Sequence, residues 1–181
     1  MGSSGPDVPL LIPEMKLTAP IIALGFCYAI LFGYVALSYG DLPAKVATHF
    51  GIDGQPNGWM SRNGIVAFTV SLGIFLPAFI VWRMATTGRI PVSFVKLPNR
   101  DYWLALERRK ATLAILFQHS LWLACMCVLF FTGVHWLIVQ ANPPHGQIHL
   151  SLIDLALVTG GFLLGTGVWV IFLRRKFFKI G

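Results

Sequence analysis

The sequence predicts an all-α integral membrane protein: a four-helix bundle with a compact irregular loop on the extracytoplasmic side. Three observations support this fold class, namely four long apolar runs, a mean hydropathy of +0.71 and a charged fraction of only 12%. Soluble domains carry about 25% charged residues. The net charge of +7 does not indicate nucleic-acid binding, because the basic residues flank the apolar runs, where they set membrane topology.

The apolar runs are predicted to be the transmembrane helices, at residues 20–39, 65–82, 111–139 and 150–173. The first run has about 20 residues without a charge, which as a helix spans about 30 Å, the thickness of the hydrocarbon core. It continues through bulky Tyr34 and Tyr39, which favours a retained span over a cleaved signal peptide. Pro77 is expected to kink the second span, and the third is long enough to require a tilt.

The connecting segments are an N-terminal segment (1–19), an outer loop (40–64), a basic loop (83–110), a short outer loop (140–149) and a basic tail (174–181). Within the basic loop, DYWLALERRK is predicted to form an interfacial helix that leads into the third span, with Asn99 or Asp101 as its N-cap.

Charge predicts the orientation of these segments. Four spans place both termini and the basic loop on one side, which then carries twelve Lys and Arg residues against two, Lys45 and Arg62, on the other. Basic residues concentrate on the cytoplasmic side of membrane proteins. Both termini are therefore expected to be cytoplasmic, and the loop at 40–64 extracytoplasmic.

That outer loop carries the densest polar pattern in the chain, DLPAKVATHFGIDGQPNGWMSRNG. Pro43 should end the first span, and closely spaced Gly, Asp-Gly and Pro-Asn supply turn chemistry. Two interpretations remain open: a structural cap over the bundle, or a binding site for a ligand or partner. The candidate binding residues are His49, Phe50, Asp53, Pro56 and Trp59.

The pattern LPAKVATHFGIDGQPNGW, between the first two spans, resembles the membrane family called domain of unknown function 1648. That family is related to the SdpI immunity proteins, which protect bacteria against a secreted killing peptide. The residues that match most closely are Leu42, Pro43, His49, Phe50, Gly54, Pro56 and Gly58. LPNRDYWLALERR, at 97–109, resembles a cytoplasmic-loop pattern of these proteins. The resemblance implies a bacterial inner membrane location and an extracytoplasmic peptide or signal as ligand.

The histidines suggest a weaker alternative, because two pairs of potential metal ligands have a spacing of four residues. This metal alternative comprises His49, Asp53, His145 and His149. Gly51 and Pro143–Pro144 argue against the helical backbone that such spacing needs. His135 and His149 are a second possible pair, for a haem near the outer surface. Ordinary hydrogen-bonded histidines are favoured, and no cofactor is expected.

Small and polar residues within the spans can be explained by helix packing or hydrogen bonding as well as by a function. Gly161 and Gly165 form a GxxxG pair that allows close helix packing, either within the chain or with a partner. Asp154, inside the fourth span, is a functional candidate that is also placed to reach water or Arg62. The cysteines Cys27, Cys125 and Cys127 lie in apolar runs and are expected to be buried.

No catalytic motif is recognisable, so an enzyme is not expected. The leading interpretation is a small non-enzymatic membrane protein, surrounded by lipid, that binds or shields against an extracytoplasmic peptide or signal. The alternative is an accessory subunit of a larger membrane complex, or a homo-oligomer, that docks through the fourth span. A small ion-binding or cofactor-binding protein is the third. Nucleic acid is not an expected partner.

Overall fold

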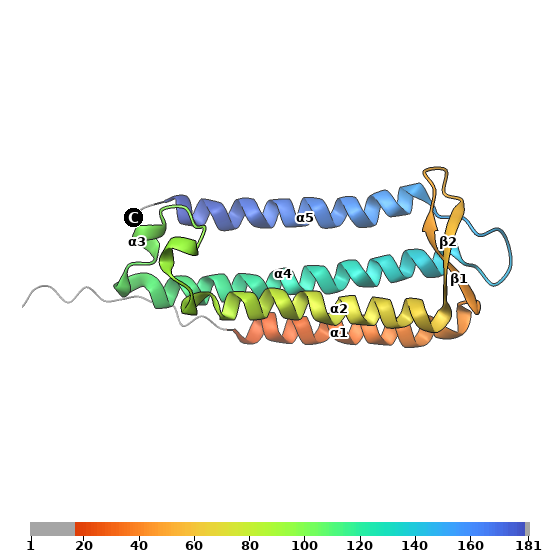
Figure 1. Ribbon diagram of the computed structural model, residues 1–181, viewed down its shortest axis with the longest axis horizontal. Helices are drawn as coiled ribbons and strands as arrows, with labels where there is room; N and C mark the ends of the chain where they lie inside the picture. The colour runs from red at the N-terminus through yellow and green to blue at the C-terminus, as the bar shows by residue number, and fades with distance from the viewer. Residues whose placement is uncertain (1–16, 180–181) are drawn as a thin grey trace, which may run out of the picture.

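The computed structural model describes residues 17–179 and contains four helices long and apolar enough to cross a membrane (Figure 1). This confirms the four predicted spans and a multi-pass membrane protein. The helices are α1 (Thr18–Ser38), α2 (Arg62–Ala85), α4 (Leu106–Ala141) and α5 (Leu152–Phe178). Most of the predicted N-terminal segment, residues 1–16, lies outside the described residues.

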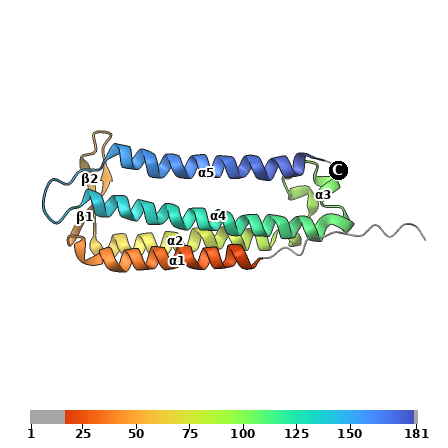
Figure 2. The same ribbon diagram turned by 180° about the vertical axis from the view of Figure 1, so that it is seen from behind.

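Helix α4 is the centre of the molecule, with α1 and α2 packed against one side of it and α5 on the other (Figures 1 and 2). The buried residues of α2 recur every four positions, at Ile65, Thr69, Gly73 and Pro77. This spacing places them on one face of the helix. A Cβ atom at Gly73 would lie 2.7 Å from Cδ2 of Leu31 in α1. Glycine at this position therefore leaves the space that the Leu31 side chain occupies. Pro77 belongs to the same face, and α2 continues through it.

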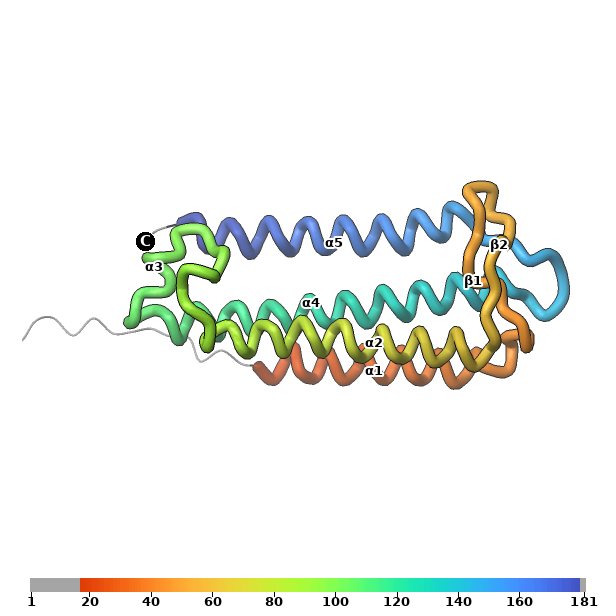
Figure 3. Tube along the Cα trace, in the orientation of Figure 1, coloured from red at the N-terminus to blue at the C-terminus, as the bar shows by residue number. Residues whose placement is uncertain are grey.

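Helix α5 differs from the other three because its apolar stretch has no buried residue. It packs against α4 along its length, and its one buried residue is Phe177, near its end. The tube in Figure 3 shows that the polar connections gather at the two ends of the bundle. We refer to these as the hairpin end, which holds residues 39–61 and 142–151, and the basic end, which holds residues 86–105.

The mostly helical fold is confirmed, but at the hairpin end the prediction of an irregular loop is corrected. After a short 3₁₀ turn, η1 (Tyr39–Asp41), strands β1 (Lys45–Phe50) and β2 (Pro56–Ser61) form an antiparallel hairpin. The tight turn is confined to residues 51–55, so the segments on either side are free to extend and pair. The closely spaced turn residues therefore connect two strands and do not make the segment irregular.

The basic end contains the 3₁₀ turns η2 (Thr87–Arg89) and η3 (Val92–Phe94) and the short helix α3 (Arg100–Trp103). The stretch predicted as one helix leading into the third span is divided, since α3 ends at Trp103 and α4 begins at Leu106. Asn99 precedes α3 with a φ of 49° and makes no side-chain cap to it. Its amide instead donates to the carbonyls of Phe177 and Phe178, at 3.1 and 3.0 Å. The loop is thereby attached to the end of α5.

Candidate functional site

The turn of the hairpin is built from residues of the polar pattern. Oδ1 of Asp53 accepts a hydrogen bond from the backbone N–H of Gln55 at 3.1 Å, which is the local bond that favours Asp in turns. Gly54 has a φ of +76°, and a Cβ there would lie 2.6 Å from the carbonyl oxygen of Leu150. Both residues therefore have the turn role that the Asp-Gly pair predicts, whereas the close approach of Leu150 to Gly54 was not predicted.

The two strands bring the five candidate binding residues onto one small element. His49 and Phe50 lie on β1, Asp53 lies in the turn, and Pro56 and Trp59 lie on β2. His49 is paired with Gly58, where a Cβ would lie 2.8 Å from the histidine Cβ. Glycine at this position therefore allows the His49 side chain to lie across the opposite strand.

The hairpin is fixed to the bundle by an apolar cluster and by one side chain. Leu42 and Val46 pack with Ile65 of α2 and Ile138 of α4. The buried amide of Asn142 accepts from the N–H of Ala47 at 2.8 Å and donates to its carbonyl at 2.9 Å. Strand β1 is therefore held between β2 on one side and Asn142 on the other.

Within residues 17–179, this bonding pattern leaves the outer edge of β2 without a backbone hydrogen-bond partner. Because both backbone groups of Ala47 are turned toward Asn142, its partner Trp59 belongs to a non-hydrogen-bonded pair. The N–H and C=O of Trp59 therefore point away from β1. The bond from the N–H of Arg62 to the carbonyl of Ala44 at 3.0 Å shows the same alternation, so Ser61 has the same orientation.

The side chains around this edge are aromatic, apolar and basic. Trp59 is 40% exposed, with Nζ of Lys45 5.2 Å from its ring centroid. Ile52, in the turn, is 96% exposed. Arg62 lies over the ring of Tyr39, 5.2 Å from its centroid, and its Nε is buried without a hydrogen-bond partner. The hairpin thus combines a free strand edge with an exposed indole and two cations.

Below the hairpin, a buried histidine connects three helices. His135 of α4 is fully buried, with Nε2 3.2 Å from Oγ of Ser38 in α1 and Nδ1 3.4 Å from Oγ1 of Thr69 in α2. The hydroxyl of Ser38 donates to the carbonyl of Tyr34 at 2.7 Å. Nε2 must therefore be the donor to Ser38, and Nδ1 accepts from Thr69. A neutral imidazole therefore satisfies the hydrogen bonds that join His135 to Ser38 and Thr69.

The metal and haem alternatives find no support in the geometry. Among residues 17–179, no group of three or more His, Cys, Asp or Glu residues is placed to hold a metal ion, so the four proposed ligands are not gathered. Nε2 of His149 lies 3.2 Å from the backbone carbonyl of Asp53, which is a contact between the outer loop and the hairpin. His135 is enclosed in the bundle, whereas His149 is exposed, so they do not form a haem-binding pair.

The remaining candidates lie along α5. Asp154 is in the first turn of α5, and its N–H donates to the Ser151 hydroxyl at 3.2 Å, an arrangement that stabilises a helix start. No ion pair with Arg62 is formed. A Cβ at Gly165 would lie 3.0 Å from Cε of Met126, so this glycine packs on α4, whereas Gly161 has nothing within 4 Å.

Sequence reasoning missed Asn142 and both hydroxyl partners of His135. Asn142 stands directly before Pro143–Pro144, a context that predicts only the short outer loop. Ser38 and Thr69 are among the few hydroxyl residues within their spans. This rarity was the one feature of the sequence that could have marked them as hydrogen-bond partners. Their common partner lies about 66 residues further along the chain from Thr69, so local spacing could not connect them.

Comparison with known proteins adds one finding. Neither the curated proteins nor the solved structures gave a match to this chain. A family match covers the second part of α1, the hairpin and the first half of α2, and therefore includes the free strand edge together with Ser38 and Thr69. The predicted resemblance is confirmed over this part of the chain: residues 26–73 match the family described as a domain of unknown function, DUF1648.

Proposed function

We propose that this protein is a non-enzymatic membrane protein whose hairpin binds an extracytoplasmic peptide by strand addition along β2. The observation that carries the proposal is the asymmetry of the hairpin. Asn142 occupies the outer edge of β1, whereas Trp59 and Ser61 of β2 direct their backbone N–H and C=O groups away from β1. An extended peptide that pairs with an open strand edge gains main-chain hydrogen bonds, and neighbouring side chains give specificity.

The surroundings of the edge suggest the chemistry of the peptide. The indole of Trp59 and the exposed Ile52 offer apolar contact, and Lys45 and Arg62 provide positive charge. We infer an extended peptide that carries apolar side chains and at least one carboxylate. In the topology that we propose, both termini are cytoplasmic, because basic residues concentrate on that side of membrane proteins, and the hairpin faces outward from a bacterial inner membrane, where it would meet such a peptide. A protective role of the SdpI kind is consistent with this position.

Two variants of one residue test the proposal. Trp59→Val and Trp59→Pro both remove the indole, but only proline removes the outward N–H, and proline is tolerated on an edge strand. Peptides from the medium of the source cells are captured on the nanodisc-embedded protein, identified by mass spectrometry and resynthesised. Binding of the synthetic peptide should be about tenfold weaker to Trp59→Pro than to Trp59→Val. Equal affinities would exclude strand addition, and failure to retain any peptide would reject the function.

A second candidate function, docking to a larger membrane complex, is favoured by α5. Gly160, Gly161 and Gly167 have nothing within 4 Å of a Cβ position, and no residue of the apolar stretch is buried. Small residues permit the close approach of a partner helix. Sizing after mild-detergent extraction, with Gly161→Leu as the test variant, distinguishes this function. A large assembly that is lost in the variant supports docking, whereas a lone 20.0 kDa chain rejects it.

A further inference from the structure

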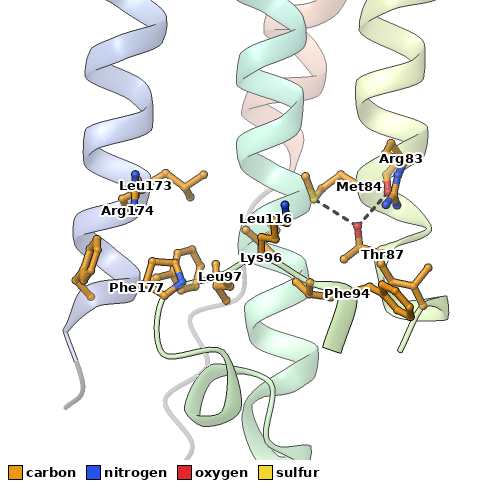
Figure 4. Close-up of a pocket in the computed structure, with 14 residues that line it drawn as sticks. Arg83, Met84, Thr87, Phe94, Lys96, Leu97, Leu116, Leu173, Arg174 and Phe177 are labelled. Carbon is orange, nitrogen blue, oxygen red and sulfur yellow. Dashed lines mark hydrogen bonds between the residues drawn. The ribbon is translucent and has the colours of Figure 1, made fainter. Parts of the chain in front are cut away.

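The basic end contains a cavity of about 860 Å³, which lies between α2, α4 and α5. Figure 4 shows that its walls come from all three helices, with Met84 on α2, Leu116 on α4 and Leu173 on α5. The volume is within the range of about 300–1,000 Å³ that is usual for small-molecule sites. The cavity is lined mainly by apolar side chains.

Three cations surround this apolar space. Figure 4 shows Arg174 on one side, Arg83 on the opposite side and Lys96 between them. No carboxylate lines the cavity, and the one ion pair of the described chain joins Arg100 to Asp101 outside it. Three like charges around a partly apolar space repel one another, and an anion placed between them would be stabilised.

The floor of the cavity is a fixed part of the fold. The indole N–H of Trp103 donates to the carbonyl of Phe177 at 2.9 Å, next to the two bonds from Asn99. At the other end of the loop, Arg109 donates to the carbonyl of Gly88 at 2.9 Å. The loop therefore closes the space between α2 and α5 toward the basic end.

Toward the middle of the membrane the cavity is not closed in this way, because α5 packs on α4 and not on α2. Within the span, lipid therefore has access between α2 and α5. Arg83 and Arg174 lie near the ends of α2 and α5, where a bilayer would place its phosphates, and the apolar walls continue into the span. A molecule that fits both parts has an anionic head and an apolar tail.

We propose that this cavity binds an anionic phospholipid, with its phosphate among Arg83, Lys96 and Arg174 and its acyl chains between α2 and α5. The site is independent of the hairpin and of the peptide proposed to bind there. The lipid fills the space between α2 and α5, which do not pack closely on each other. A free phosphate carries the same kind of charge as this headgroup but has no apolar part to contact the apolar walls.

The test compares two lipids with identical chains. The full-length protein in mild detergent is mixed with equal amounts of dioleoyl phosphatidylglycerol and dioleoyl phosphatidylcholine, and the retained lipid is counted by native mass spectrometry. We expect one phosphatidylglycerol to be retained in preference to phosphatidylcholine by about tenfold or more. Equal retention of the two lipids would overturn the proposal. Displacement of the lipid by millimolar inorganic phosphate would assign the site to a free anion and overturn it as well.

A matched pair of triple variants separates a built site from general surface charge. Arg83→Gln, Lys96→Gln and Arg174→Gln together remove the three lining charges, and the preference should fall to about twofold or less. Arg89→Gln, Lys110→Gln and Arg175→Gln remove three exposed charges of the same end that do not line the cavity, and should preserve it. An equal loss in both variants would show that the attraction is not specific to the cavity.

A third variant tests the apolar part and leaves all charges in place. Leu173→Trp enlarges a half-buried wall residue and should reduce the retained lipid severalfold. Circular dichroism and thermal unfolding confirm that the variant is folded. Unchanged retention by a folded Leu173→Trp protein would place the lipid outside the cavity.

Discussion

Asn142 and Ala47 are joined by two hydrogen bonds, one in each direction, although 95 residues separate them in the sequence. The side-chain amide of Asn142 takes the place that a third strand would have beside β1. One buried residue thereby attaches the hairpin to the end of α4 and closes one of its two edges.

We predict that Asn142→Leu destabilises the hairpin end by about 2–4 kcal/mol, because it leaves the N–H and C=O of Ala47 buried without partners. Amide hydrogen exchange of Ala47 should become much faster, and the thermal unfolding temperature in detergent should fall. Gln147→Leu, in the exposed outer loop, is the control and should change stability by less than about 0.5 kcal/mol. Unchanged protection of Ala47 would contradict the role of Asn142.

The contact of His135 with Thr69 predicts coupling between two helices. His135→Leu and Thr69→Val should each cost about 1–2 kcal/mol, since each leaves the other side chain without its partner. The double variant should cost less than the sum, because the orphaned group is removed as well. Unfolding in a denaturing detergent measures all three proteins. Strictly additive losses would show that the 3.4 Å contact has no energetic role.

Gly54 is predicted to be the least replaceable glycine of the hairpin. Gly54→Ala combines a left-handed backbone with a clash against the Leu150 carbonyl and should cost about 2–3 kcal/mol. The bond from the N–H of Leu150 to the Gly54 carbonyl, now 3.0 Å, should break. Gly146→Ala is the comparison, since its φ is +120° but its nearest neighbour is 3.9 Å away. It should cost only about 1 kcal/mol, and similar losses for the two variants would be evidence against the clash.

At the basic end, Trp103→Phe distinguishes the contribution of the indole N–H from that of the aromatic ring. Phenylalanine keeps the edge-to-face contact with Phe177, now at 5.3 Å between centroids, but it cannot donate to the Phe177 carbonyl. We expect a loss of about 1 kcal/mol and faster amide exchange in the last turn of α5. Asn99→Gly keeps the left-handed backbone and removes the two neighbouring bonds, so it should act in the same direction. If neither variant alters exchange there, the loop does not hold α5.

Much of the helical architecture follows from the sequence, because the bilayer requires long uncharged segments and the chain has four of them. The resemblance of the outer loop to DUF1648 is also readable, because the pattern LPAKVATHFGIDGQPNGW carries it. The hairpin was missed because β1 buries the adjacent residues Val46 and Ala47 and does not show strict alternation. Val46 packs in the apolar cluster, while Ala47 is bonded to Asn142.

The separation of α5 from α2 and the cavity beside it could not be predicted. Every span is apolar on all sides, so composition does not distinguish a face that meets protein from one that meets lipid. Asn99 illustrates the same limit, since it was expected to cap the helix that follows it and instead bonds to the carbonyls of Phe177 and Phe178. Such partners depend on how the bundle is assembled, and local spacing does not contain this information.

The isolation of α5 has a consequence for biogenesis. Nearly all of the buried side chains belong to α1, the hairpin, α2 and α4, whereas α5 contributes only Phe177. The first three spans can therefore complete most of their packing before α5 docks against α4. Insertion of α5 is then a late docking step that is secured at its two ends, by Leu150 at the hairpin and by Asn99 at the basic loop.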